Sequence, residues 1–203
     1  MATHRIWPST NGGTVAGDTN TADLGVEFYV TSACTFQGYY WWCATSASTA
    51  TSLLTFRLFS TTNGTSGTAI TAGTVAGSGT LTAGAWNAFT VASPPTLTAN
   101  THYRAVITST QTSVNWYSST AGYFTTGGGG ASNIVNGPLV CPNSTNTLNN
   151  AQCSFNEPSA SPYFPVSSSG NQNYWLDVSV ADLTTFGSHI VQTGQAVKRA
   201  SLW

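Results

Sequence analysis

Short segments in which apolar and polar residues alternate recur along the whole chain. In the segment 24–30, every second residue is large and apolar, from Leu24 to Val30. A period of two is typical of a β-strand with one buried face. Other segments also read as strands, from their apolar residues and their length, and turns rich in Gly, Ser, Thr and Asn separate them. They lie at 34–43, 53–59, 85–91, 102–108, 114–117 and 174–180. The pattern predicts an all-β fold, a β-sandwich of the jelly-roll or immunoglobulin-like type, with negligible helix before residue 181.

Three regions can be separated along the sequence. Residues 1–20 are expected to form an extended N-terminal arm, residues 21–180 the sandwich, and residues 181–203 a C-terminal arm. A loop insertion is expected at 127–172, because it opens with four consecutive glycines, which disfavour a strand interior, and continues rich in Asn, Ser and Pro. The core is expected to include Leu24, Val26, Phe28, Leu54, Phe56, Leu58, Tyr103, Ala105 and Ile107.

Charged residues make up only 5% of the 203 residues, and the net charge is −1. An average soluble protein has about 25%. No stretch forms a basic patch, which excludes nucleic acid as the expected partner. No apolar run approaches the roughly 20 residues of a membrane-spanning helix. The N-terminal residues lack the apolar core of a signal peptide. We therefore expect either a removed signal or synthesis in a cytoplasm followed by release, for example by host lysis.

Four cysteines are present, and an even number in a Thr/Ser/Gly-rich surface protein favours disulfides. Proximity in the sequence pairs Cys34 with Cys43 and Cys141 with Cys153. Free buried thiols and a zinc site remain as alternatives. The spacings of eight and eleven intervening residues differ from the short spacing of common zinc ligands.

The chain has few groups that could perform catalysis. A glycoside hydrolase needs two carboxylates, and Glu27 with Asp177 are the candidates, although pairing of each with Arg57 or Arg104 is the favoured interpretation. The three histidines show no metal-binding spacing, and no serine lies in a Gly-x-Ser-x-Gly motif. We therefore expect no catalytic residues, no cofactor and no enzyme activity. A structural calcium ion held by Asp18 and Asp23 is a weaker alternative.

The run Tyr39-Tyr40-Trp41-Trp42 would place one aromatic pair in the core and the other on the outer face of its strand. Exposed aromatic residues mark interfaces and can pack on sugar rings. The candidate interface or glycan-facing residues are Tyr40, Trp42, Trp116 and Tyr117. Coverage of this outer pair by a neighbouring segment or subunit is the favoured interpretation.

Seven ordered segments resemble a family of bacterial secreted domains of unknown function. They are Leu24–Phe28, Phe36–Tyr40, Leu54–Phe59, Trp86–Val91, Pro95–Tyr103, Tyr163–Pro165 and Asn173–Val178. Members of that family are similar to carbohydrate-binding β-sandwiches and are often appended to cell-surface or polysaccharide-acting proteins. The resemblance covers about residues 22–180 and implies the fold, but fold alone does not set function. The chain departs from the family in its Ser or Thr at positions that are charged there, in its cysteines and in its two arms.

The favoured functional hypothesis is a non-enzymatic structural protein on the surface of a bacteriophage virion, a minor tail or capsid decoration protein. Its partners would be other virion proteins, copies of itself and host-surface carbohydrate. The alternative is a carbohydrate-binding module of a secreted bacterial protein. Because an arm loses conformational entropy when it becomes ordered, we expect it to gain burial on a neighbour. The expected assembly residues of the two arms are Trp7, Ile190, Leu202 and Trp203.

Overall fold

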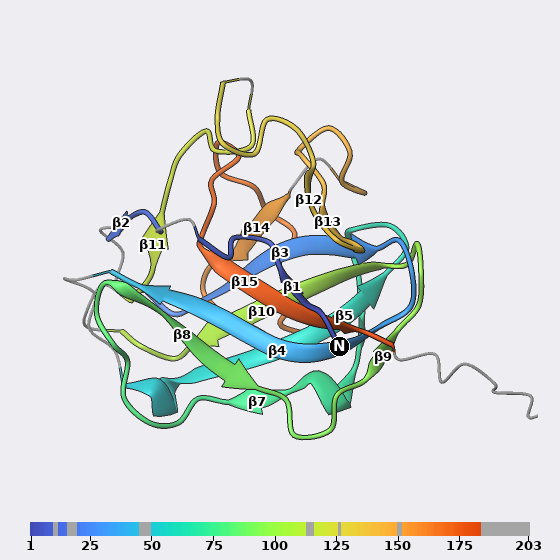
Figure 1. Cartoon of the computed structure of the whole chain (residues 1–203). Coiled ribbons are helices and arrows are strands. Elements are labelled where there is room, and N and C mark those ends of the chain that lie inside the picture. Colours follow the sequence, from blue (N-terminus) through green and yellow to red (C-terminus); the bar gives the residue numbers. More distant parts are fainter. Residues whose placement is uncertain are drawn as a thin grey trace, which may run out of the picture.

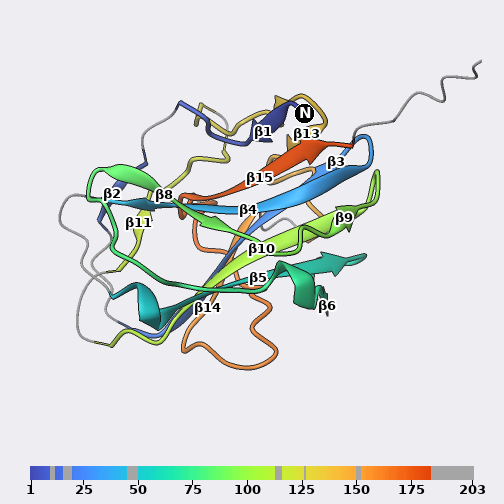
Figure 2. The ribbon, with the colours of Figure 1, turned by 60° about the horizontal axis from the view of Figure 1, so that its bottom comes forward.

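The computed structural model describes residues 1–9, 12–15, 20–44, 50–112, 116–125, 127–149 and 152–183. Two antiparallel sheets pack face to face as a β-sandwich (Figures 1 and 2). One sheet has the order β1 (Thr3–Arg5), β15 (Leu176–Asp182), β4 (Cys34–Cys43) and β8 (Ala85–Thr90), and β9 (Thr96–Leu97) also pairs with β4. The predicted fold class is therefore confirmed.

The second sheet is larger and contains the longest runs of regular pairing. Its order is β12 (Ile134–Asn136), β13 (Leu139–Cys141), β3 (Ala22–Val30), β10 (His102–Ser109), β5 (Leu54–Thr61) and β6 (Thr68–Ala69). Two more strands pair at its edges, β14 (Cys153–Asn156) with β3 and β7 (Val75–Ala76) with β5. A separate small ladder joins β2 (Thr14–Val15) to β11 (Ser118–Ser119). Within the described ranges the helical elements are two single 3₁₀ turns, η1 (Thr51–Leu53) and η2 (Thr71–Gly73).

The core lies between the two sheets, and all nine residues that the alternation placed there are buried in it. Aromatic rings link the layers: the ring of Phe28 on β3 stacks on Phe36 of β4 with centroids 6.2 Å apart. Phe56 of β5 packs against Phe89 of β8 at 4.2 Å. Full burial of each such side chain contributes about 1.5–3 kcal/mol, so these inward-facing rows are the main source of stability.

The outer face of β3 is also buried, which the sequence did not indicate. Asp23 and Glu27 have no exposed surface, because residues of the segment 127–172 cover them. The prediction that this segment is a loop insertion is therefore wrong. The segment contributes β12, β13 and β14, and two of these strands pair directly with β3. Their pairing satisfies backbone groups that an uncovered edge of β3 would leave open.

The N-terminal residues belong to the sandwich and do not form a free arm. β1 pairs with β15, with His4 opposite Val180. Ile6 and Trp7 follow and are only 3% and 2% exposed. The predicted arm at 1–20 is therefore wrong for residues 3–7, whose backbone is held by strand pairing and whose apolar side chains enter the core.

At the other end of the chain, Ala181 and Asp182 complete β15. The remainder of the predicted C-terminal arm, with Ile190, Leu202 and Trp203, lies outside the described residues. The predicted strand 114–117 is only partly described. Its last two residues, Trp116 and Tyr117, precede the short strand β11 without belonging to a strand.

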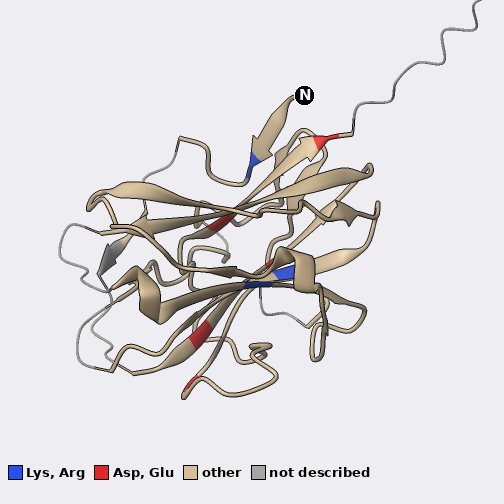
Figure 3. Ribbon diagram, turned by 90° about the horizontal axis from the view of Figure 1, so that it is seen from below, with Lys and Arg blue, Asp and Glu red and all other residues tan. Residues whose placement is uncertain are grey.

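Charged residues are sparse along the described ribbon and are spread over several strands (Figure 3). Most carboxylates and guanidinium groups are paired inside the protein, as described below. None of the helical turns in the described part of the chain is long and apolar enough to cross a membrane.

Candidate functional site

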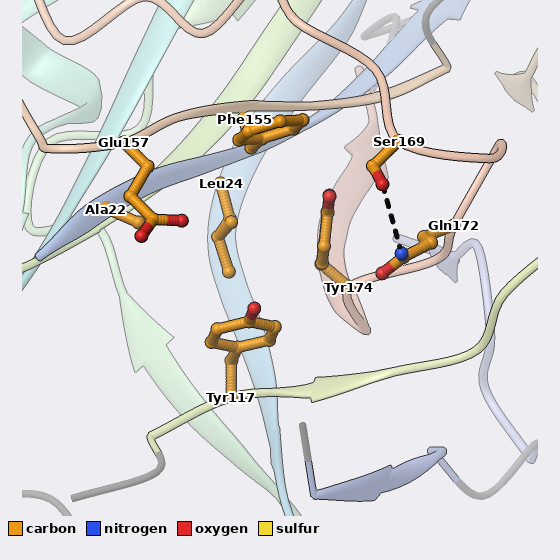
Figure 4. Close-up of a pocket in the computed structure, with 8 residues that line it drawn as sticks. All are labelled: Ala22, Leu24, Tyr117, Phe155, Glu157, Ser169, Gln172 and Tyr174. Atoms are coloured by element: carbon orange, nitrogen blue, oxygen red, sulfur yellow. Dashed lines mark hydrogen bonds between the residues drawn. The ribbon is translucent and has the colours of Figure 1, made fainter. Parts of the chain in front are cut away.

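A hollow of about 230 Å³ opens at the end of the sandwich where β3 begins (Figure 4). Its lining comes from four separate parts of the chain. The lining residues are Ala22, Leu24, Tyr117, Phe155, Glu157, Ser169, Gln172 and Tyr174. Figure 4 shows these side chains arranged around one space, with Phe155 and Tyr117 on opposite sides and Glu157 facing Tyr174 across it.

Apolar and aromatic groups form the floor and walls of this hollow. Leu24 is a core residue, and its strand places it at the bottom of the opening. Phe155 sits beside it because β14 pairs with β3 in the register Phe155 opposite Leu24. Tyr117 and Tyr174 meet edge to face with ring centroids 5.8 Å apart. The hollow therefore offers aromatic surface for an apolar ligand face.

Tyr117 is held in place by buried aromatic residues behind it. Its neighbour Trp116 is 1% exposed and stacks on the core residue Trp41 at 5.8 Å. The Trp116 indole N–H donates to the Asn20 carbonyl at 3.1 Å. The rings of Trp116 and Tyr117 are themselves 5.2 Å apart, edge to face. This support fixes Tyr117 before any ligand arrives, which lowers the entropic cost of binding.

The polar side of the hollow comes from a tight turn and from the residue after β14. Gly170 and Asn171 both have positive φ, 58° and 51°, and the Gln172 N–H donates to the Ser169 carbonyl at 3.2 Å. Two central residues of positive φ define a type I′ turn, which suits Gly and Asn. The turn presents Ser169 and Gln172, whose side chains are 3.4 Å apart and hydrogen-bonded. Glu157 is exposed at the opposite rim.

The composition of this hollow suits the recognition of a small molecule. It combines aromatic faces with a carboxylate, an amide and a hydroxyl, which is the mixture found in small-molecule sites. Its volume is below the roughly 300–1,000 Å³ of sites for drug-sized ligands, so it matches one small ring. Its polar side chains include a single carboxylate, whereas the two-carboxylate mechanism of glycoside hydrolysis needs a pair.

The other predicted glycan-facing residues lie elsewhere and are largely covered. Trp42 is 8% exposed, and a side chain at Gly12 would collide with its ring. Tyr40 is half-buried, because the Arg5 guanidinium sits 3.6 Å above its ring. Trp116 is buried as described above, so of the four residues Tyr117 alone lines the hollow. The outer aromatic pair is therefore covered by the N-terminal segment of the same chain.

The two carboxylates considered as a catalytic pair are each bound by separate partners. Glu27 accepts from Arg104 at 2.8 Å, contacts His102 at 2.8 Å and accepts from the Leu148 N–H at 3.1 Å. The predicted pairing of Glu27 with Arg104 is thus confirmed. Asp177 instead pairs with Arg5 at 3.0 Å, not with Arg57 or Arg104, because β1 runs antiparallel beside β15.

The carboxyl group of Asp177 is buried, and its pKa is shifted by its surroundings. Its carboxylate also accepts from the backbone N–H groups of Ile6 at 2.8 Å and Trp7 at 3.2 Å. Burial raises the pKa of Asp177 from 3.8 to about 6, although Arg5 and these hydrogen bonds act in the opposite direction. Desolvation of the charged form therefore outweighs the pairing.

All four cysteines are buried free thiols, so the predicted disulfides are absent from the structure. Cys34 and Cys43 are the first and last residues of β4. At about 3.3 Å per residue they lie about 30 Å apart, and a disulfide cannot bridge α-carbons more than about 7 Å apart. Cys141 and Cys153 both enter the core from strands beside β3, and burial raises the pKa of Cys153 to about 12.

Asp23, one of the two residues considered as calcium ligands, is engaged by other side chains. Asp23 accepts from Thr108 at 2.6 Å and from Ser159 at 2.9 Å. Asp18 lies outside the described residues. In the part of the chain that the structure describes, no three His, Cys, Asp or Glu side chains gather as metal ligands would.

The sequence did not identify most of the residues that line the hollow, namely Phe155, Glu157, Ser169, Gln172 and Tyr174. The Gly170-Asn171 dipeptide, followed within four residues by two aromatic residues, was an available signal for a turn that presents side chains. Nothing in the sequence indicates that this turn would meet Tyr117, which lies more than fifty residues earlier.

Comparison with known protein families gives a match that covers most of the chain. The model of a family described as "Domain of unknown function (DUF4082)" matches residues 9–176. No curated protein matches the chain. Since the match spans most of the 203 residues, the chain belongs to the DUF4082 family of domains of unknown function.

Proposed function

We propose that this protein is a non-enzymatic β-sandwich surface module that binds carbohydrate in the hollow lined by Tyr117 and Tyr174. The hollow is the observation that carries the proposal, because it joins aromatic walls to a carboxylate, an amide and a hydroxyl at one opening. A pyranose ring has an apolar C–H face that packs on aromatic rings and a rim of hydroxyl groups that bond to such polar groups. The supporting stack of Trp116 on Trp41 keeps the binding surface in place.

The absence of enzyme activity is part of this proposal. Glu27 is engaged by Arg104 and His102, and Asp177 by Arg5 and two backbone N–H groups. Neither residue lines the hollow. The expected result is binding of glycans without release of product.

We propose further that the module is displayed on the outside of a bacteriophage virion, as a minor tail or capsid decoration protein contacting host-surface glycans. A secreted carbohydrate-binding module is the alternative. The low charge of the chain and its Ser/Thr/Gly/Asn-rich turns suit an exterior that depends little on electrostatic steering. Recovery of the chain with virus particles on a density gradient, and not free in the medium, would support the virion; free recovery would favour the alternative.

Binding is tested with a glycan array followed by titration of the strongest ligand. Tyr117→Ala is expected to weaken binding about tenfold or more, since it removes one aromatic wall. Tyr29→Ala is the matched control. Tyr29 is a half-buried tyrosine on the outer face of β3 next to His102, outside the hollow. If no glycan binds, or if both variants bind as the wild type does, the proposed function is wrong.

A further inference from the structure

A second hollow lies next to the first and shares one lining residue with it. This second hollow, of about 330 Å³, is lined by Asn20, Thr21, Thr112, Glu157 and Pro158. Glu157 is the residue common to both. The two hollows therefore adjoin at one exposed carboxylate, and together they form a site longer than a single ring.

The two hollows differ in chemistry. The first is walled by Tyr117, Tyr174 and Phe155, whereas the described lining of the second contains no aromatic residue and presents the hydroxyl groups of Thr21 and Thr112. A ligand with one ring packed on the aromatic walls would continue past Glu157 into the second hollow. An elongated, hydroxyl-rich ligand matches this order, with its first ring on the aromatic wall and its next ring among hydrogen-bonding side chains.

Glu157 sets the charge of this elongated site. The Asn20 side-chain amide donates to one of its carboxylate oxygens. None of the described residues that line the two hollows is Lys, Arg or His, so no cation of the lining offsets this negative charge. An anionic group placed between the hollows would meet uncompensated repulsion, and a protonated amine would be attracted.

We infer that the site takes a glycan of at least two sugar rings that is neutral or carries an amino group, with Glu157 excluding acidic sugars. This inference rests on the proposed function and adds the ligand class and the residue that selects it. Because Glu157 is exposed and lies at the rim, its replacement by Gln leaves the fold intact.

The experiment compares the wild type with Glu157→Gln on an array of neutral, amino-containing and acidic glycans at low salt. We expect the wild type to bind neutral or amino glycans and to disfavour their acidic counterparts about tenfold or more. In Glu157→Gln this discrimination should fall at least severalfold. Asp182→Asn is the matched control: it removes the same charge where β15 ends, beside Cys34, at the opposite end of the sandwich from Leu24. It should keep the wild-type pattern.

Ligand length is tested on the same proteins by inhibition. A disaccharide of the best ligand should inhibit about tenfold better than its monosaccharide, because only the disaccharide reaches both hollows. Preference for acidic glycans, unchanged discrimination in Glu157→Gln, or equal inhibition by both lengths would each overturn the inference. If glycans bind and depend on Tyr117 in these cases, the proposed function still holds; if no glycan binds at all, both fail.

Discussion

Asp177 shows how a single buried acid ties the N-terminus to the sandwich. Its carboxylate is inaccessible to solvent and receives the Arg5 guanidinium and the N–H groups of Ile6 and Trp7. An ionised group at such a position is costly unless it is fully paired. Here the pairing is extensive, yet burial still raises the pKa of Asp177 to about 6. The protein therefore gains stability from protonation of this group.

The first prediction concerns the pH dependence of stability. The pKa of Asp177 is higher in the folded state, about 6, than its ordinary value of 3.8. The folded state consequently binds more protons between these values, and the contribution of Asp177 to stability increases as the pH falls through 6. Between pH 8 and pH 5 this amounts to about 1 kcal/mol. Asp177→Asn should reduce the rise in unfolding free energy by that amount, measured by urea denaturation at both pH values.

The exposed carboxylate of Glu157 provides the control for this experiment. Glu157→Gln should leave the rise between pH 8 and pH 5 as in the wild type, because the side chain lies at the surface. A full wild-type rise in Asp177→Asn would mean that another group is responsible. At pH 8 the Asn variant should also be less stable than the wild type, because the amide N–H₂ of Asn cannot accept the hydrogen bonds that Arg5 and the Trp7 N–H donate to the carboxylate.

The second prediction concerns the four thiols. Each is buried, and burial raises the pKa of Cys34, Cys43, Cys141 and Cys153. The thiolate is the reactive form, so the native protein at pH 7.5 should react negligibly with a maleimide. After denaturation without reductant, mass spectrometry should show four labels per chain. Labelling of only two cysteines, with four after reduction, would instead demonstrate one disulfide.

At the scale of elements, the N-terminal segment works as a strand followed by an aromatic anchor. β1 extends the sheet beside β15, and the Trp7 ring then packs on Trp175 at 5.7 Å and on Phe124 at 6.5 Å. Its indole N–H donates to the Tyr123 hydroxyl at 3.0 Å. The loop that carries Tyr123 and Phe124 returns through Gly130, where a side chain would collide with the Phe124 ring. The segment and this loop therefore stabilise one another.

The third prediction tests whether Trp7 stabilises its own chain. Trp7→Ala should lower the free energy of unfolding by about 3–5 kcal/mol, as expected when a large aromatic residue is removed from a core. Val135→Ala is the control, because Val135 on β12 is 63% exposed and its truncation should cost little. The oligomeric state of Trp7→Ala, measured by sedimentation at a temperature where it is folded, should match the wild type. If Trp7→Ala dissociated an oligomer without lowering stability, Trp7 would be an assembly residue after all.

At the scale of the whole molecule, the sequence predicted the sandwich well but not the segments that pack on it, residues 3–7 and 127–172. The alternation at 24–30, 53–59 and 102–108 is a local property of each strand, and these segments became β3, β5 and β10. The covering of β3 by the segment 127–172 depends on contacts such as Leu148 with Glu27, more than a hundred residues apart. The predicted pairing of Cys34 with Cys43 failed because residues close in sequence lie far apart along one extended strand.

The candidate site was predictable only in part, because it too depends on contacts between residues far apart in the sequence. Tyr117 could be named as an aromatic candidate, but its partners Phe155, Glu157 and Tyr174 join it through turns whose positions the sequence does not specify. Glu157 is one carboxylate among six, and its role at the junction of two hollows becomes visible only once β14 is paired with β3.

The fourth prediction separates the sandwich from the segment that follows it. β15 ends at Asp182, and the described core is complete at that point. A chain ending at Leu183 should therefore fold, with a thermal midpoint within about 4 °C of the full chain, the shift that 1 kcal/mol produces in a domain of this size. Its glycan binding should also persist, because the described residues that line the two hollows all precede Leu183.

The same truncation tests how the module is attached. The removed residues include Ile190, Leu202 and Trp203, whose apolar side chains suit burial on a neighbour. We expect the truncated chain to lose incorporation into particles, or self-association, while it keeps its fold and its ligand. Unchanged incorporation would place the attachment surface on the sandwich itself. Failure to fold, seen as loss of the β-sheet circular dichroism signal, would show that the core needs residues beyond Leu183.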